Sequence, residues 1–276
     1  MMTFRTIMVQ LDVDAAAGPR LKFASELARQ FEADLIAVAA AEARFVVPVG
    51  DDGIVAADAM RWQVEEIEER LMALQREFQS LMASNPRASW RGYVGDPTRL
   101  LASNARAADL IVVGSPGPAV VSDHNRTVDQ GALILSAGRP ILLASGDLAP
   151  VRYESAVVAW KDTREARRAV VDAMPFLTKA QHVLVVTVED NEGKAARESA
   201  TDVVLYLMKH GVKARSEVMD VGGSLAADAL AEAASEAGAN LIVSGGYGHS
   251  RLREWALGGV TRSLLRETGI HRLMSN

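Results

Sequence analysis

The sequence contains no cysteine among its 276 residues. That absence excludes a disulfide framework, a thiolate nucleophile and a zinc site built on cysteine. Long apolar runs are missing as well, since no stretch approaches the roughly 20 residues that a membrane-spanning helix needs. Positive charge is not in excess, because the net charge is −5 and the pI is near 5.6. Neither half carries a basic stripe, so we expect no nucleic-acid partner and no membrane partner.

What is present is the composition of a folded protein, with 49% hydrophobic and 24% charged residues. A chain of this length is long enough for two domains, each with its own core. The first residues, 1–6, lead directly into a strand-like run and not into the basic and then apolar pattern of a signal peptide. We therefore expect a cytoplasmic protein.

The chain contains an internal repeat. Residues 109–117 read Asp-Leu-Ile-Val-Val-Gly-Ser-Pro-Gly, and residues 240–248 read Asn-Leu-Ile-Val-Ser-Gly-Gly-Tyr-Gly, 131 positions later. Between the two halves lies a polar stretch with glycine and proline, 146–150, which is typical of a domain boundary. The sequence therefore predicts one domain over residues 1–146 and a second over 151–276.

Apolar runs of strand length alternate with helical patterns in both halves. The expected strands are 6–12, 35–39, 89–93, 110–113 and 140–144 in the first half, and 155–161, 183–188, 214–219, 241–244 and 272–274 in the second. Near-continuous apolar strands are typical of sheets covered on both faces. The alternation predicts an α/β fold with two tandem doubly wound, mostly parallel five-stranded sheets and helices on both faces.

One expected helix, over residues 60–81, carries an unusually regular apolar stripe. The stripe steps by four and three residues through Met60, Val64, Ile67, Leu71, Leu74, Phe78 and Leu81. Two interpretations remain open: the helix packs on its own sheet, or part of the stripe forms a helix contact between subunits.

A glycine-rich segment follows the expected strand 241–244. Gly245, Gly246 and Gly248 allow the backbone to approach a phosphate closely, and Gly258 and Gly259 open a final helix whose free amides favour an anion. Nearby donors add to this set. They are His249 and Ser250 in the loop, and the backbone of Val260 and the hydroxyl of Thr261 in the first turn of the helix.

The spacing Gly245-x2-Gly248-x9-Gly258 after a Leu-Ile-Val strand resembles the ATP-binding signature of the universal stress protein family. The resemblance covers essentially the whole chain as a tandem pair. It implies ATP or another adenine nucleotide as ligand, with magnesium accompanying ATP. The family motif continues with serine or threonine where this chain has Gly259, and Thr261 follows two residues later.

The resemblance divides the family's residues between the two halves. Family members that bind ATP carry an aspartate at the end of the first strand, a position that maps to Asp12 in the first half and to Lys161 in the second. In the first half the late glycines are replaced by Thr127 and Val128, and Pro118 removes an amide donor. We therefore expect nucleotide binding mainly in the second half, where Ala159, Trp160 and Lys161 border the same crevice.

Catalytic signatures are not found in the sequence. A Walker loop and a Gly-x-Ser-x-Gly elbow do not occur, and the five histidines lack the spacing of a metal site. We expect no catalytic residues, no metal site and at most slow ATP hydrolysis. The sequence thus predicts a stress-response protein acting as a regulatory or survival factor, as a homo-oligomer or an intrachain pseudo-dimer. Two alternatives are an interaction scaffold that binds no nucleotide and a binder of another small ligand.

Overall fold

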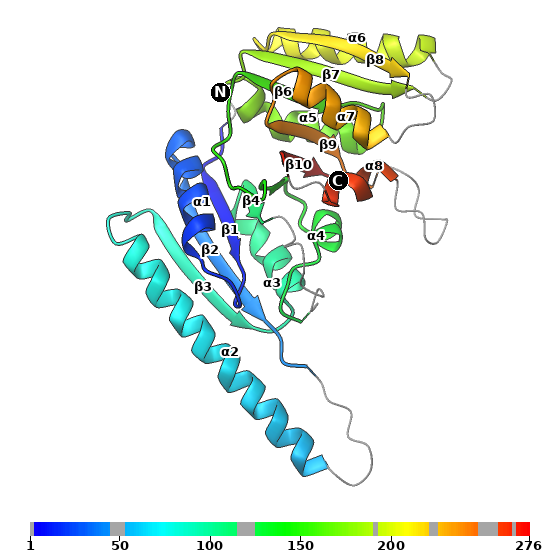
Figure 1. Cartoon of the computed structure of the whole chain (residues 1–276). Coiled ribbons are helices and arrows are strands. Elements are labelled where there is room, and N and C mark those ends of the chain that lie inside the picture. The colour runs from blue at the N-terminus through cyan, green and yellow to red at the C-terminus, as the bar shows by residue number, and fades with distance from the viewer. Residues whose placement is uncertain are drawn as a thin grey trace. The chain divides into compact units, whose positions relative to one another are not determined.

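Strands and helices alternate along the chain as the sequence predicts (Figure 1). The computed structural model describes residues 3–44, 53–114, 125–189, 193–220, 226–247, 259–266 and 269–276. The chain divides into two compact units. The N-terminal unit comprises Arg5–Val113 and Gly117–Ala137, and the C-terminal unit is built on Gly138–Asn276. Each is described separately below.

The N-terminal unit contains a parallel sheet in the order β3-β2-β1-β4. Its elements are β1 (Thr6–Leu11), α1 (Gly18–Phe31), β2 (Asp34–Ala41), α2 (Gly53–Leu81), β3 (Ala88–Val94), α3 (Pro97–Asn104), the 3-10 turn η1 (Ala105–Ala107), β4 (Leu110–Val113) and α4 (Gln130–Ser136). Helices α1 and α2 contact each other on one face, and α3 and α4 contact each other on the other face (Figure 1). Nearly every residue of β1, β2 and β4 is buried because helices cover both faces.

The C-terminal unit contains a sheet in the order β5-β10-β9-β6-β7-β8. Its elements are β5 (Ile141–Leu143), β6 (Ser155–Ala159), α5 (Arg164–Leu177), β7 (His182–Glu189), α6 (Gly193–Lys209), β8 (Ala214–Asp220), α7 (Ala226–Glu236), β9 (Leu241–Gly245), α8 (Gly259–Arg266) and β10 (His271–Ser275). All neighbouring strands are parallel except β5, which pairs antiparallel with β10. The α/β class and the mostly parallel sheets predicted from the sequence are confirmed.

Strand β5 has an antiparallel partner that the sequence does not reveal. Ile141, Leu142 and Leu143 pair with Met274, Leu273 and Arg272 of β10. The sequence predicts residues 140–144 as the last strand of the first half, and the division between compact units falls after Ala137, ahead of β5. All three β5 residues are fully buried.

The long helix α2 packs on its own sheet. Ile67, Leu71, Leu74 and Phe78 are buried, and α2 contacts β2, β3 and α1. The Phe78 ring lies against Trp90 of β3, with ring centroids 5.8 Å apart. Met60 and Val64, nearer the start of the helix, are half-buried. From Ile67 to Phe78 the stripe therefore serves intrachain packing, as the first interpretation predicts, whereas Leu81 at its end is 47% exposed.

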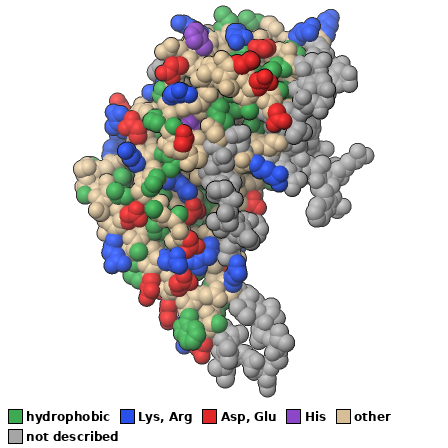
Figure 2. Space-filling view, viewed as in Figure 1, with side chains coloured by type: hydrophobic (Ala, Val, Ile, Leu, Met, Phe, Trp, Pro, Cys, Tyr) green, Lys and Arg blue, Asp and Glu red, His purple; other side chains and the backbone are tan. Residues whose placement is uncertain are grey.

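The other side of α2 is charged. Basic and acidic side chains alternate along the visible part of this helix (Figure 2), and two of the ion pairs are Arg61 with Asp58 and Arg70 with Glu66. Two large apolar side chains interrupt this polar surface: Trp62 is 70% exposed and Met72 is 54% exposed. Within the described residues, no helix is both long enough and apolar enough to cross a membrane.

His271, the first residue of β10, fixes the polar stretch that the sequence marks as a boundary. Its Nδ1 accepts the Ser145 amide at 2.9 Å, and its Nε2 donates to the Ala149 carbonyl at 2.8 Å. Both bonds require the neutral imidazole with the proton on Nε2. Burial lowers the pKa of His271 to about 4, because a second proton would lose solvation and would oppose the Ser145 amide.

The packing of α2 predicts different costs for two truncations. Ile67→Ala, at a fully buried position, is expected to lower the free energy of unfolding by about 2–5 kcal/mol. Trp62→Ala, at an exposed position on the same helix, is expected to change it by less than about 0.5 kcal/mol. Urea unfolding measures both. A Trp62→Ala cost equal to that of Ile67→Ala would show that another surface covers this end of the helix.

The His271 environment predicts a pH dependence of stability. The unfolded imidazole gains its proton near pH 6.5 and the folded one only near pH 4, so the stabilisation is complete above pH 6.5 and is lost as the pH falls toward 4. The loss amounts to about 3 kcal/mol across that window. The Ser145 hydroxyl and the Ala149 amide hold the pKa of Asp147 below its ordinary value, so its contribution is lost only at lower pH.

Denaturant unfolding at several pH values, compared with His271→Gln, checks this dependence. The variant is expected to be less stable at pH 7.5 and to lack the slope between pH 6.5 and 4. Identical slopes for the two proteins would assign the pH dependence to other groups.

Candidate functional site

The predicted crevice of the C-terminal unit lies at the carboxyl ends of β6 and β9. These strands are neighbours and parallel, with Ala159 opposite Ser244, so Trp160 and Lys161 emerge beside Gly245 and Gly246. Ligands of doubly wound sheets bind at such an edge. The structure therefore brings together two segments of the predicted site that are more than 80 residues apart in the sequence.

Gly245 has a packing role. A Cβ atom at this position would lie 2.6 Å from the amide nitrogen of Ala166 and 2.7 Å from the carbonyl carbon of Glu165, both in the first turn of α5. No side chain fits there unless the backbone moves. The sequence explains Gly245 by close approach of a phosphate, whereas the structure shows close approach of the N-terminal turn of α5.

The start of the glycine segment is anchored to its surroundings. The Gly246 amide donates to the Ser275 carbonyl at 2.7 Å, and the Gly246 carbonyl accepts from the side chain of Asn276 at 2.8 Å. Tyr247 adopts a left-handed conformation with φ 62°, and its amide lies 3.5 Å from the hydroxyl of buried Thr261. This contact holds the first turn of α8 close to the end of β9.

The remaining loop positions of the prediction are not described. Gly248, His249, Ser250 and Gly258 lie outside the described residues, and Gly259 and Val260 form the first residues of α8. Their contribution to a ligand site stays a prediction.

The two residues that follow β6, Trp160 and Lys161, differ in their exposure to solvent. Trp160 is only 7% exposed, and its indole nitrogen donates to the Ser199 hydroxyl of α6 at 3.3 Å. Lys161 is exposed. The neighbouring Asp162 carboxylate accepts two hydrogen bonds from Arg167, at 2.6 and 2.9 Å, which satisfies it within the chain.

In the N-terminal unit, the position that corresponds to Lys161 is Asp12, and other side chains of the protein bind its carboxylate. The Arg20 guanidinium lies 2.7 Å from one oxygen of Asp12, and the Gln10 side chain donates to the other oxygen at 2.7 Å. Arg20 also donates to the Gln10 carbonyl at 2.9 Å. The aspartate that the family resemblance assigns to the nucleoside is thus held in a local network.

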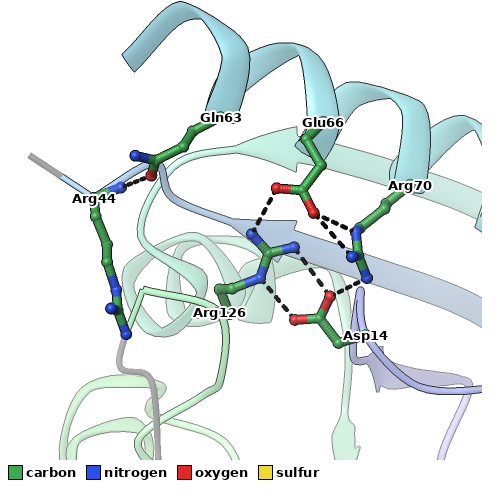
Figure 3. A network of polar contacts seen from close by, with 6 residues as sticks. All are labelled: Asp14, Arg44, Gln63, Glu66, Arg70 and Arg126. Carbon is green, nitrogen blue, oxygen red and sulfur yellow. Dashed lines mark hydrogen bonds and ion pairs between the residues drawn. The ribbon is translucent and has the colours of Figure 1, made fainter. Parts of the chain in front are cut away.

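A second network crosses the same edge of the N-terminal sheet (Figure 3). Arg126, which follows β4, binds both oxygens of Asp14 at 2.7 and 3.0 Å. Arg70 of α2 bridges Asp14 and Glu66, and Arg126 lies 3.6 Å from Glu66. Hydrogen bonds from Arg126, together with the charges of Arg126 and Arg70, hold the pKa of Asp14 below its ordinary value against the effect of burial.

These four side chains join three segments: the β1–α1 connection, α2 and the β4–α4 connection. The sequence analysis did not predict this network. No local pattern identifies the partners, since 112 residues separate Arg126 from Asp14.

The helices that follow the two loops begin differently. Asp129 caps α4, and its carboxylate accepts the Ala132 amide at 3.0 Å. That carboxylate takes the place an anion would occupy at this helix N-terminus and would repel a phosphate. Helix α8 begins at Gly259 and has no acidic residue in its first turn. Within the described residues, the first turn of α8 thus carries no carboxylate, whereas α4 begins with the carboxylate of Asp129.

Metal-binding clusters are not found in the part of the chain that the structure describes, where no group of three or more His, Asp or Glu side chains could hold an ion.

The contact between Gly245 and α5 predicts a stability effect. Gly245→Ala is expected to lower the free energy of unfolding by about 1–3 kcal/mol, because its methyl group would meet backbone atoms of α5. Gly18→Ala is the matched control, since a Cβ there meets only side-chain atoms at 3.5 Å or more and should change stability by less than about 0.5 kcal/mol. Chemical denaturation measures both. An unchanged free energy of unfolding in Gly245→Ala would contradict the tight packing of Gly245 against α5.

The whole chain resembles solved structures of known fold. It superposes on a universal stress protein from Archaeoglobus fulgidus DSM 4304 with a TM-score of 0.70 at 16% identity, covering 98% of this chain and 96% of that chain. A functionally unknown protein from Pseudomonas aeruginosa PAO1 gives a TM-score of 0.60 at 15% identity, covering 99% and 92%. No curated protein matches the sequence. At these identities the likeness shows the fold.

The family is identified by sequence over the first half of the chain. Residues 3–133 match the model of the universal stress protein family. This region includes the Asp12 network, the degenerate glycine loop and the start of α4. The N-terminal half of the chain, residues 3–133, therefore belongs to the universal stress protein family.

Proposed function

We propose that the protein is a cytoplasmic stress-response factor that binds ATP or a related adenine nucleotide in its C-terminal unit. The observation that carries the proposal is the difference between the two helix starts. Asp129 provides an anion of its own at α4, whereas α8 begins with glycine close to the end of β9. A helix N-terminus with no carboxylate in its first turn favours phosphate through its free amides and its dipole.

The proposed site combines the loop, the start of α8 and the residues after β6. It comprises Gly245, Gly246, Gly248, His249, Ser250, Gly258, Gly259, Val260, Thr261, Ala159, Trp160 and Lys161. The anchoring of Gly246 and the packing of Gly245 give these two glycines the role of shaping the loop. Direct phosphate contacts would then come from the later amides and from Lys161, which is exposed at the same edge.

No residue is proposed as catalytic. Magnesium would accompany ATP, and bound ATP would be hydrolysed slowly at most. The protein would act through the conformation that the nucleotide stabilises, as a regulatory or survival factor and as a homo-oligomer or an intrachain pseudo-dimer.

Thermal unfolding with and without ATP and magnesium tests the proposal. At an ATP concentration 100 times Kd the expected stabilisation is about 2.7 kcal/mol, which raises Tm by several degrees. Gly248→Val should abolish the shift, because its side chain would occupy the loop, whereas Gly117→Val at the matching position of the first half should leave it intact. An unmoved Tm, with no adenine nucleotide in the purified protein by mass spectrometry, would sink the proposal.

The exposed Trp62 and Met72 favour a second candidate, an interaction scaffold that uses α2 and binds no nucleotide. Light scattering separates the two. Loss of an oligomer in Trp62→Ala, together with no response to ATP, would support the scaffold.

A further inference from the structure

A cavity lies between α5 and α6 in the C-terminal unit. Its volume is about 450 Å³, within the range of small-molecule sites. In the N-terminal unit the corresponding helices α1 and α2 contact each other, whereas here the space between the helices is open. None of the residues that line the cavity belongs to the glycine loop or to α8.

Five of the residues that line the cavity are apolar or aromatic: Trp160, Val170, Val171, Val203 and Tyr206. Tyr206 is 36% exposed. Trp160, Val170 and Val203 are almost fully buried. The hydrogen bond from the Trp160 indole to Ser199 fixes the ring. The Tyr206 ring packs against His210, with centroids 4.6 Å apart. An aromatic ligand would therefore find preformed walls that include two aromatic rings.

The charged residues that line the cavity, Asp162, Arg167 and Asp202, leave one negative charge in excess. Asp162 and Arg167 neutralise each other through two hydrogen bonds. Asp202 also lines the cavity and is exposed, and no described residue pairs with it. An uncompensated carboxylate beside aromatic rings favours a cation and disfavours a phosphate.

We propose that this cavity binds an arylalkylamine, a small aromatic ring system that carries a protonated amine. The ring lies against Trp160 and the valines, and the ammonium group pairs with Asp202. The aromatic faces add a cation–π attraction. The cavity shares Trp160 with the proposed nucleotide site but contains no residue of the glycine loop or of α8, so a negative result for ATP leaves this proposal standing.

Three indole probes of similar size and different charge test the proposal by isothermal titration calorimetry at pH 7: tryptamine, neutral tryptophol and anionic indole-3-acetate. Tryptamine is expected to bind at least tenfold more tightly than indole-3-acetate, with tryptophol between them. Equal affinities for the three probes, or no binding of tryptamine, would overturn the proposal.

Two substitutions locate the site. Asp202→Asn should weaken tryptamine binding about tenfold and leave tryptophol unchanged, whereas Glu198→Gln, one turn earlier on α6 and outside the cavity lining, should change neither. Val171→Trp should abolish binding of all three probes by filling the cavity. Near-ultraviolet circular dichroism checks the fold, and Asp202→Asn keeps the test decisive if Val171→Trp does not fold. Unaltered tryptamine binding in Asp202→Asn would overturn the proposal.

Discussion

The parallel pairing of strands is the constraint on which the polar network of the N-terminal unit and the candidate site of the C-terminal unit both depend. In a parallel sheet all carboxyl ends meet at one edge, and the connections that leave this edge meet there whatever their separation in sequence. In the N-terminal unit this brings Asp14, the α2 side chains and Arg126 together. In the C-terminal unit it brings the residues after β6 beside those after β9. The edge is common to the two units, and what differs between them is the chemistry of the side chains that reach it.

That chemistry separates the halves of the repeat. In the N-terminal unit the polar groups at this edge are bound by other groups of the same unit. Arg20 and Gln10 bind Asp12, Arg126 and Arg70 bind Asp14, and Asp129 caps α4. Each of these contacts uses a charge or a donor that would otherwise be available to a ligand. The C-terminal unit has glycine where α8 begins and an exposed lysine after β6. A duplicated fold can therefore carry different side-chain chemistry at the same edge of its two sheets, without a change in topology.

Several sequence predictions were confirmed because they depend on local patterns. The strand runs appear close to their predicted bounds, since burial on one or both faces imposes a period on the apolar residues. The helix predicted over residues 60–81 ends as predicted but begins earlier, at Gly53. Other features were not predictable in this way. The sequence does not show that the backbone of α5 packs against Gly245. It also does not show which of the acidic residues of α2 lies near Arg126, namely Glu66. The antiparallel pairing of β5 with β10 likewise depends on a strand that is distant in the sequence.

The sequence by itself determined the fold class, the tandem repeat and the family, because each of these depends on periodicity and spacing along the chain. Tertiary structure decided which polar groups are already satisfied. Asp12, Asp14 and Gly246 look available in the sequence, and each has its partner in the folded chain. Tertiary structure also decided where space remains, between α5 and α6. The physical reason is that hydrogen bonds, ion pairs and cavities depend on distances between segments that the order of residues alone does not specify.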